Sequence, residues 1–380
     1  MAPLYFKKFG SSDENYTRLD DDITSPWTEL ELPEDKREGQ SAKGGQFSVV
    51  RKIKIHPDNR NFGGEDDHFA LKIIKQTPSS FLSEQIFLRE IRANRRLGSP
   101  HERIVPLLTA FKRKEASYLV FPWAGGGSLR QLWERTTPPD EPDRSFPEWC
   151  SVDWLWQQSL GIAEGVAYMH GLGPHTPGQI RPTAQIHGDI KPENILSFPT
   201  IVDSVYSFEL KLADFGVSQK VDADGQVQTW KLVHTLTYRP PEKDLEKEMA
   251  SLRWDSWCLG AVYLEFITWF LLGYHGVERF QRARENDTGA LAGSQTLGRH
   301  YEDTFFTKEV TDPLLRAPSI EVRKVAKVKK SVTSHIKLLK SLAKCNDRLR
   351  TFLAYIERHL LVVDDDKRAT AEDVRCFLRD

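Results

Sequence analysis

This 380-residue sequence has few cysteines, no excess of one charge and no long hydrophobic run. Cysteine is rare, and no two of its four copies have the paired spacing of a zinc site or a redox couple. An excess of one charge is also missing, because 53 lysines and arginines face 54 acidic residues. Net charge therefore indicates neither a nucleic-acid binder nor a membrane-surface protein. We expect an intracellular protein of a reducing compartment, cytoplasmic or nuclear. The cysteines are Cys150, Cys258, Cys345 and Cys376.

Long hydrophobic runs are missing as well. The first ten residues, MAPLYFKKFG, lack the apolar core of a secretory signal. The most apolar run, residues 259–274, contains Glu265 and is shorter than the roughly 20 residues that a membrane-spanning helix needs. We therefore expect no membrane association, and we expect this run to be a helix buried in a protein core.

The composition is that of a globular protein, with 39% hydrophobic and 28% charged residues. A chain of this length holds one large bilobed domain or two smaller domains. Residues 1–27 are polar, with an acidic cluster at residues 20–22, and predict a solvated extension. The folded part is therefore expected at about residues 28–380.

The folded part divides by pattern into two lobes, which predicts an α+β fold class. Residues 28–122 contain short β-like runs and one helical stretch at 81–97, typical of a small β-rich lobe with one main helix. Residues 123–380 have mainly helical patterns and predict a larger lobe. A segment at about residues 275–350 interrupts these patterns and is interpreted as a long insertion.

The strongest chemical signal is the run His-Gly-Asp-Ile-Lys-Pro-Glu-Asn at residues 187–194, followed 20 residues after Asn194 by Asp-Phe-Gly at 214–216. Phosphoryl transfer needs an oriented nucleophile and cations that neutralise phosphate charge. One aspartate can accept the proton of an incoming hydroxyl, while a second aspartate and an asparagine offer the oxygen ligands that Mg²⁺ prefers. The set therefore indicates phosphoryl transfer, although each piece alone is common.

In this order, the runs resemble the signatures of the eukaryotic protein kinase family, serine/threonine type. The resemblance implies a bilobed fold, ATP and Mg²⁺ as cofactors, and a protein hydroxyl as phosphate acceptor. It implies that Asp189 is the catalytic base and that Lys191 contacts the γ-phosphate. Asn194 and Asp214 would bind Mg²⁺, and Phe215 would set the active or inactive arrangement.

The resemblance also implies a nucleotide site in the small lobe. Lys72, in an alternating apolar strand, corresponds to the lysine that holds the α- and β-phosphates, and Glu90 on the following helix corresponds to its partner. At the hinge, adenine would contact the carbonyl of Pro122 and the backbone of Ala124, so a proline is tolerable because it lacks only the N–H. The other implied nucleotide-binding residues are Gly45, Val50, Ala70 and Phe121.

Downstream, the run Thr-Leu-Thr-Tyr-Arg-Pro-Pro-Glu at residues 235–242 resembles the end of an activation segment. The resemblance pairs Glu242 with Arg368 and places Asp255 at the start of the central buried helix. These are scaffold residues, whose loss is expected to affect stability. Thr235 is expected to hydrogen-bond near the catalytic aspartate.

Two motifs depart from the family pattern. In the glycine-rich loop only Gly45 is kept, because Lys43 and Ser48 replace the two outer glycines. Glycine lets backbone amides approach a phosphate closely, so this loop predicts weakened ATP binding. Gly188 stands where many relatives carry an arginine that pairs with a phosphorylated activation segment. We therefore expect something other than a single phosphorylation to order that segment.

The segment that begins at Arg323 and ends at Arg350 is basic, with ten lysines or arginines against one acidic residue, Asp347. Its apolar residues at helical spacing favour an amphipathic helix packed on the lobe, with a solvated basic face. The alternative is a docking surface for an acidic partner. The apolar residues are Val325, Val328, Val332, Ile336 and Leu339.

Three functions compete for this sequence. An active protein serine/threonine kinase is favoured because the lysine, the glutamate, both aspartates and the asparagine of the motif set are all present. A pseudokinase that binds nucleotide without turnover is the alternative, because of the altered glycine-rich loop. A small-molecule kinase is disfavoured, since residues 191–194 and Thr235 together resemble protein serine/threonine kinases.

Overall fold

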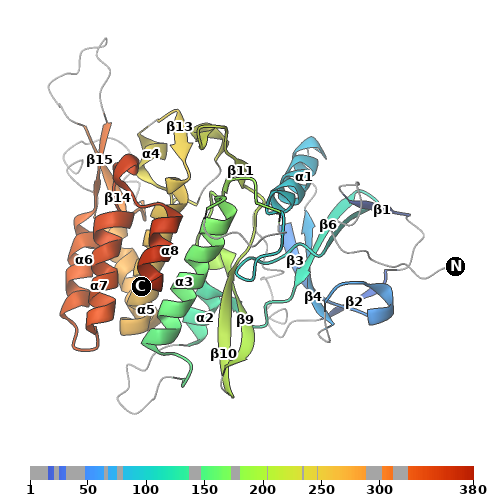
Figure 1. Cartoon of the computed structure of the whole chain (residues 1–380), viewed down its shortest axis with the longest axis horizontal. Helices are drawn as coiled ribbons and strands as arrows, with labels where there is room; N and C mark the ends of the chain where they lie inside the picture. The colour runs from blue at the N-terminus through green and yellow to red at the C-terminus, as the bar shows by residue number, and fades with distance from the viewer. Residues whose placement is uncertain are drawn as a thin grey trace, which may run out of the picture.

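The computed structural model of the chain has a small lobe rich in strands and a larger lobe rich in helices (Figure 1), which confirms the predicted bilobed α+β fold. The residues described are 16–20, 25–30, 48–63, 67–74, 80–136, 147–172, 180–202, 204–232, 235–245, 247–287, 302–310 and 324–380. Gly45 and Lys43 of the predicted phosphate-binding loop lie outside these residues, as does Arg323.

The small lobe is built on a six-stranded sheet with the strand order β1-β5-β6-β4-β3-β2. All neighbouring strands are antiparallel except the first pair, which is parallel. One long helix, α1, packs on the sheet, as the pattern at residues 81–97 predicts. The elements are β1 (Thr17–Leu19), β2 (Trp27–Leu30), β3 (Ser48–Ile55), β4 (His68–Ile74), α1 (Ser80–Arg96), β5 (Thr109–Arg113) and β6 (Ala116–Pro122).

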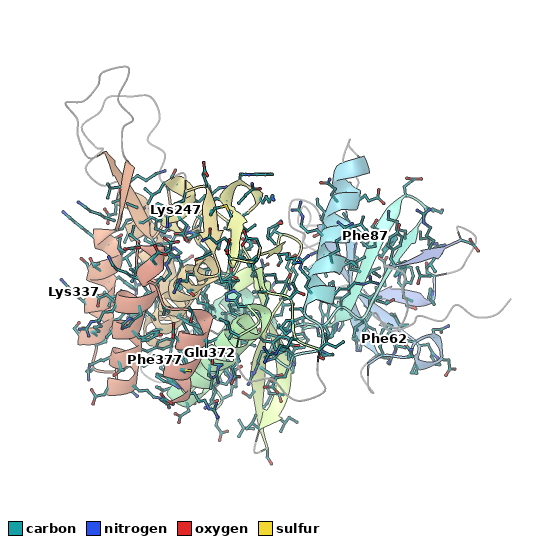
Figure 2. All side chains as sticks on the ribbon, turned by 45° about the horizontal axis from the view of Figure 1, so that its top comes forward. Phe62, Phe87, Lys247, Lys337, Glu372 and Phe377 are labelled. Carbon is teal, nitrogen blue, oxygen red and sulfur yellow. The ribbon has the colours of Figure 1, made fainter. Side chains whose placement is uncertain are left out.

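Side-chain alternation gives this sheet two separate apolar clusters. Phe62 and Leu71 belong to one cluster, whereas Phe87 of α1 and Ile74 belong to the other. Figure 2 labels Phe62 and Phe87 on the small lobe, one residue from each cluster. Because successive strand residues point to opposite faces, Lys72 faces away from the cluster of Leu71 and toward the side of α1.

Part of the predicted N-terminal extension is structured. Thr17–Leu19 forms β1, which pairs with β5 in parallel register, Leu19 opposite Arg113. Leu19 is buried, and Tyr16 packs its ring edge-on against Phe87 with the ring centroids 5.2 Å apart. The expectation of a solvated tail is therefore wrong for these residues, because β5 offers an open sheet edge that the polar composition of the tail does not reveal.

The larger lobe surrounds α5, in which every residue from Trp254 to Trp269 is buried. A long hairpin formed by β9 and β10 extends from the side nearest the small lobe (Figure 1). Ser151 caps the N-terminus of α3 by accepting a hydrogen bond from the backbone of Trp154, and Thr370 with Asp373 forms a capping box on α8. The elements are β7 (Gly127–Ser128), α2 (Leu129–Arg135), α3 (Val152–Met169), β8 (Gln185–Ile186), β9 (Ile195–Val202), β10 (Val205–Leu212), β11 (Gln219–Lys220), β12 (Gln226–Gln228), α4 (Pro241–Asp244), β13 (Met249–Ser251), α5 (Arg253–Asn286), α7 (Asp347–Tyr355) and α8 (Ala371–Arg379).

Helix α5 contains the apolar run that the sequence predicts to be buried. By length and composition it could cross a membrane, but 89% of its most apolar window is buried inside the protein. The predicted core helix is therefore confirmed. The helix also continues past its expected end to Asn286, across a kink at Gly273, where φ is 72° and ψ is −179°. Glycine adopts this backbone conformation without steric penalty.

The predicted insertion starts inside α5 and then forms a hairpin and a helix. β14 (Phe306–Val310) pairs with β15 (Lys324–Val328), and α6 (Lys330–Ser341) packs on α5. The predicted amphipathic helix is correct for Val332, Ile336 and Leu339, which are buried in α6. It is wrong for Val325 and Val328, which lie in β15. The spacing of three residues between these two valines suits a helix and places them on opposite faces of a strand. The pairing of β15 with β14, which the local spacing does not reveal, therefore decides the structure here.

Candidate active site

The loop that carries the predicted catalytic base is held by one buried carboxylate. Asp255, at the start of α5, accepts hydrogen bonds from the backbone N–H of His187 at 2.7 Å and of Gly188 at 3.0 Å. His170 Nε2 lies 2.9 Å from the same carboxylate. Gly188 has φ +84°, a conformation that favours glycine over any side chain with a Cβ. Glycine in place of the family arginine at position 188 is therefore compatible with the geometry of this loop.

Asp189 lies at the centre of a hydrogen-bond network. Asn194 donates its side-chain N–H to the Asp189 carbonyl at 2.8 Å and to Oδ2 at 3.0 Å. Lys191 Nζ lies 2.6 Å from Asp189 Oδ2 and 2.7 Å from Thr235 Oγ1. Thr235 donates to Asp189 Oδ1 through its hydroxyl at 2.6 Å and through its backbone N–H at 3.1 Å. The predicted neighbourhood of Thr235 is thus present, and both carboxylate oxygens of Asp189 are fixed in place.

Lys72 connects the two lobes. Its Nζ lies 2.8 and 2.9 Å from the carboxylate oxygens of Glu90 on α1, and 2.8 Å from Oδ1 of Asp214. Burial favours the neutral amine, but the charges of Asp214 and Glu90 outweigh it and raise the pKa of Lys72. At Asp214, whose side chain is 46% exposed, partial desolvation favours the neutral acid, but the Lys72 charge prevails and lowers the pKa to about 2. Both groups are therefore ionised at neutral pH.

Asp214 also has an unusual backbone. Its φ is +65°, which is uncommon for a residue other than glycine. Such strain persists only where surrounding contacts hold the residue in place, and it concentrates at functional sites. Here the contacts are the ion pair with Lys72 and the Gly216 N–H, which donates to Oδ1 at 3.3 Å.

Four of the predicted nucleotide-binding residues point to one face of the sheet. In the strand register Val50 lies opposite Lys72, and Ala70 lies opposite Phe121, so all four point to the same side. Val50, Ala70, Phe121, Pro122 and Ala124 are each only half-buried. The Ala124 carbonyl accepts the Gly127 N–H at 2.9 Å, which turns the chain into the larger lobe.

The predicted scaffold residues are buried and paired. Phe215 is 1% exposed, with its ring centroid 5.1 Å from that of His187. Arg368 binds both oxygens of Glu242, at 2.9 and 3.0 Å, and also donates to the carbonyls of Val362 and Arg253. A bidentate pair with further hydrogen bonds is the arrangement in which buried charges are tolerated.

The sequence did not reveal how the activation segment is attached to the larger lobe. β12 pairs with β13, which places Val227 opposite Ala250, and both are buried. Beyond β12, the Thr229 N–H donates to the Glu248 carbonyl at 2.8 Å, and Lys243 Nζ donates to the Thr229 carbonyl at 3.0 Å. This segment is therefore ordered by strand pairing.

Sequence reasoning also missed a buried charged cluster beside the segment. Glu265 in α5 is 1% exposed and pairs with Arg284, which in turn binds Asp303. The signal that could have found it is Glu265 itself, because a carboxylate inside a buried apolar run requires a partner. The sequence could not identify the other members of the cluster, because only the tertiary fold brings Arg284 and Asp303 close to Glu265.

In the basic segment several cations are already engaged. Lys340 pairs with Glu357, Arg348 with Asp153 and Arg350 with Asp347, while Lys329 is buried. Lys337 is exposed on the outer face of the larger lobe, far from the junction of the lobes (Figure 2). These contacts favour the solvated-face interpretation over a concentrated docking surface.

Comparisons with known proteins indicate one family. The protein kinase domain family model matches residues 44–376. The chain is 28% identical over 261 residues to the leucine-rich repeat receptor-like protein kinase PEPR2 of Arabidopsis thaliana, covering 63% of this chain and 21% of that protein. It is 30% identical over 245 residues to the serine/threonine-protein kinase GE16371 of Drosophila yakuba, covering 63% and 28%. It is 28% identical over 223 residues to cyclin-dependent kinase-like 2 of Rattus norvegicus, covering 59% and 36%.

The chain thus spans at most 36% of the length of these relatives. Because the family model covers most of the chain, the protein belongs to the protein kinase family. That family uses ATP and Mg²⁺ to phosphorylate proteins.

The residues present fit Mg·ATP. Asn194 uses its amide nitrogen to bind Asp189, so its oxygen points away from that contact. The Asp214 side chain is 46% exposed and ionised. An amide oxygen and a carboxylate are ligands that Mg²⁺ prefers, and Lys72 supplies a cation for phosphate.

Proposed function

We propose that this protein is an active serine/threonine kinase that transfers the γ-phosphoryl of Mg·ATP to a protein hydroxyl. The observation that carries the proposal is the contact of Lys72 with both Glu90 and Asp214, at 2.8 to 2.9 Å. It joins strand β4, helix α1 and the Asp-Phe-Gly run in the arrangement that phosphoryl transfer requires. Serine/threonine specificity is supported by Thr235, which bridges Asp189 and Lys191.

Bound Mg·ATP supplies the phosphoryl group and the cation that neutralises its charge. The chain contributes orientation and proton transfer. The Asp189 carboxylate accepts the proton of the acceptor hydroxyl, and Thr235 and Asn194 keep that carboxylate in place. Lys191 stabilises the negative charge that the phosphate carries beside it. Asn194 and Asp214 would hold the metal.

The proposal is tested by measuring ATP-dependent phosphorylation of a mixed serine, threonine and tyrosine peptide substrate, with and without Mg²⁺. Mg²⁺-dependent phosphoserine or phosphothreonine supports the proposal. Nucleotide binding without transfer identifies a pseudokinase, the alternative that the replacement of a family glycine by buried Ser48 supports. Phosphotyrosine as the main product contradicts the proposed specificity.

Replacing the proposed metal ligand should weaken nucleotide binding. We expect Asp214→Ala to lower the affinity for Mg·ATP by at least about tenfold, or ~1.4 kcal/mol, because it removes a metal ligand and a partner of Lys72. Asp224→Ala is a matched control, because Asp224 is an exposed acid of the same segment. Calorimetric titration with Mg·ATP measures both variants. Equal affinities would contradict the role of Asp214.

Activity should not require phosphorylation of the activation segment. Gly188 stands in place of the usual arginine, and strand pairing already orders residues 226–228. The hydroxyl residues of the segment that could be phosphorylated are Ser218, Thr229 and Thr237, and the first two are buried, at 1% and 5% exposure. We therefore expect phosphatase-treated protein made in bacteria to keep most of the activity of untreated protein at saturating Mg·ATP. Mass spectrometry reports the phosphorylation state.

The alternative is that a second basic pocket binds a phosphate of the activation segment. The comparison of phosphatase-treated with untreated protein tests this alternative. Lys220 and Lys231 line a pocket of about 410 Å³ beside β12, where a phosphate could find a cation. A loss of activity greater than about tenfold on phosphatase treatment, ~1.4 kcal/mol of barrier, would show that phosphate orders the segment.

A further inference from the structure

A chain of buried charges links the end of the activation segment to the insertion. Glu265 accepts the Tyr238 hydroxyl at 2.7 Å and pairs with Arg284 at 2.8 Å. Arg284 also binds Asp303, at 2.7 Å through Nε. The other oxygen of Asp303 accepts the Thr237 hydroxyl at 3.4 Å. The activation segment is therefore contacted at two neighbouring residues by one connected cluster.

The guanidinium at the centre of this cluster is held rigidly. Arg284 is 1% exposed, and its Cζ lies 4.2 Å from the ring centroid of Phe280 and 4.3 Å from that of Phe305. Lys329, also buried, donates to the carbonyls of Arg284 and Glu302 at 2.8 and 2.7 Å. Stacking and fixed hydrogen bonds restrict the side chain to one orientation, so Asp303 is presented at a fixed place.

A second link runs parallel to the first. Arg239 is 4% exposed and binds Asp244 through two hydrogen bonds of 2.7 Å. The same guanidinium binds Glu302 at 3.0 Å. Lys308 on β14 bridges Asp244 and Glu302 at 2.9 and 3.4 Å. Adjacent acids of the insertion, Glu302 and Asp303, thus hold the segment on both sides of Tyr238.

These contacts lie within four residues of the catalytic network. Thr235, two residues before Thr237 and four before Arg239, donates to Asp189 and contacts Lys191. A displacement of the segment would carry Thr235 with it and release one oxygen of Asp189. The insertion is therefore in a position to control the orientation of the proposed base.

We propose that Glu302 and Asp303 are positioning residues that hold residues 235–242 in the arrangement needed for transfer. The insertion thus performs, within the chain, the ordering that a phosphate and the arginine missing at position 188 would provide. The expected change of kcat rests on the proposed kinase activity. The expected order of residues 235–242 does not depend on that activity.

The test is the double variant Glu302→Gln with Asp303→Asn, which keeps shape and removes both charges. We expect kcat to fall at least about tenfold, equivalent to ~1.4 kcal/mol, with KM for ATP changed less than about twofold. We also expect faster hydrogen–deuterium exchange in residues 235–245. The matched control is Glu278→Gln with Asp347→Asn, which removes two acids from exposed ion pairs of the same region.

A variant on the segment side keeps the test valid if the double variant does not fold. Thr237→Val removes the hydroxyl that contacts Asp303 and leaves Arg284 paired. It should cause a smaller change of kcat and of exchange in the same direction. Unchanged exchange in residues 235–245 of a folded double variant would overturn the inference. An inactive wild-type protein whose double variant still shows faster exchange would refute the kinase activity and support the positioning role.

Discussion

Asp189→Asn should lose phosphate transfer almost completely while the protein remains folded and binds nucleotide. The substitution preserves shape but removes the basic oxygen that would accept the proton of the acceptor hydroxyl, a contribution of about 10²- to 10⁴-fold in rate. Because Lys72, Asp214 and the hinge are untouched, affinity for Mg·ATP should stay within about twofold of wild type. The measurement is kcat on a generic substrate, together with a calorimetric titration of Mg·ATP.

The control for this variant is Asp224→Asn, which makes the same chemical change at an exposed position of the activation segment. Wild-type turnover in Asp189→Asn would refute the assignment of the base. A large loss of nucleotide affinity would instead show that Asp189 shapes the nucleotide site. In that case the network with Asn194 and Lys191 would be mainly structural.

Arg368→Leu is expected to have the largest effect on stability. The guanidinium pairs with Glu242 at 2.9 and 3.0 Å, and both side chains are almost fully buried. Removing one partner leaves an uncompensated buried carboxylate, which typically lowers the free energy of unfolding by about 3–5 kcal/mol. Urea unfolding followed by intrinsic tryptophan fluorescence measures the change.

Lys367→Ala is the matched control, because the adjacent Lys367 pairs with Asp364 at 2.8 Å but its side chain is 77% exposed. An exposed pair contributes about 0–1 kcal/mol. The double variant Arg368→Leu with Glu242→Leu should recover part of the lost stability, because no charge is then left unpaired. Equal losses for Arg368→Leu and Lys367→Ala would contradict the role assigned to the buried pair.

The candidate site residues could be located from sequence because each lies in a short run that resembles a protein kinase signature. Lys72 lies in an alternating strand and Glu90 in an apolar helical pattern, so the periodicities place both on the face where they meet. Asp189, Lys191 and Asn194 lie within six residues, and the loop that carries them is short. The contacts within residues 189–194 are therefore local. The contacts of Lys72 with Asp214 and of Asp189 with Thr235 join residues 142 and 46 positions apart and depend on the fold.

The rest of the site depends on long-range contacts that no local pattern encodes. Arg284, the partner of Glu265, follows it by 19 residues, and Asp303, which binds Arg284, follows it by 38, so only the folded larger lobe brings the three together. Gly273 is a typical signal for the end of a helix, and it does interrupt the helical backbone of α5. From the sequence, the second helical stretch, which follows Gly273 and ends at Asn286, is interpreted as part of the insertion.

The parallel pairing of β1 with β5 has a practical consequence for protein engineering. A recombinant fragment that starts at residue 28, the boundary that composition predicts, would omit β1 and leave β5 as the edge of the sheet. Exposed edge strands present unpaired N–H and C=O groups that recruit other chains and promote aggregation. Leu19 and Tyr16, which cover apolar surface of the small lobe, would be lost with it. A fragment for expression should therefore begin before Tyr16.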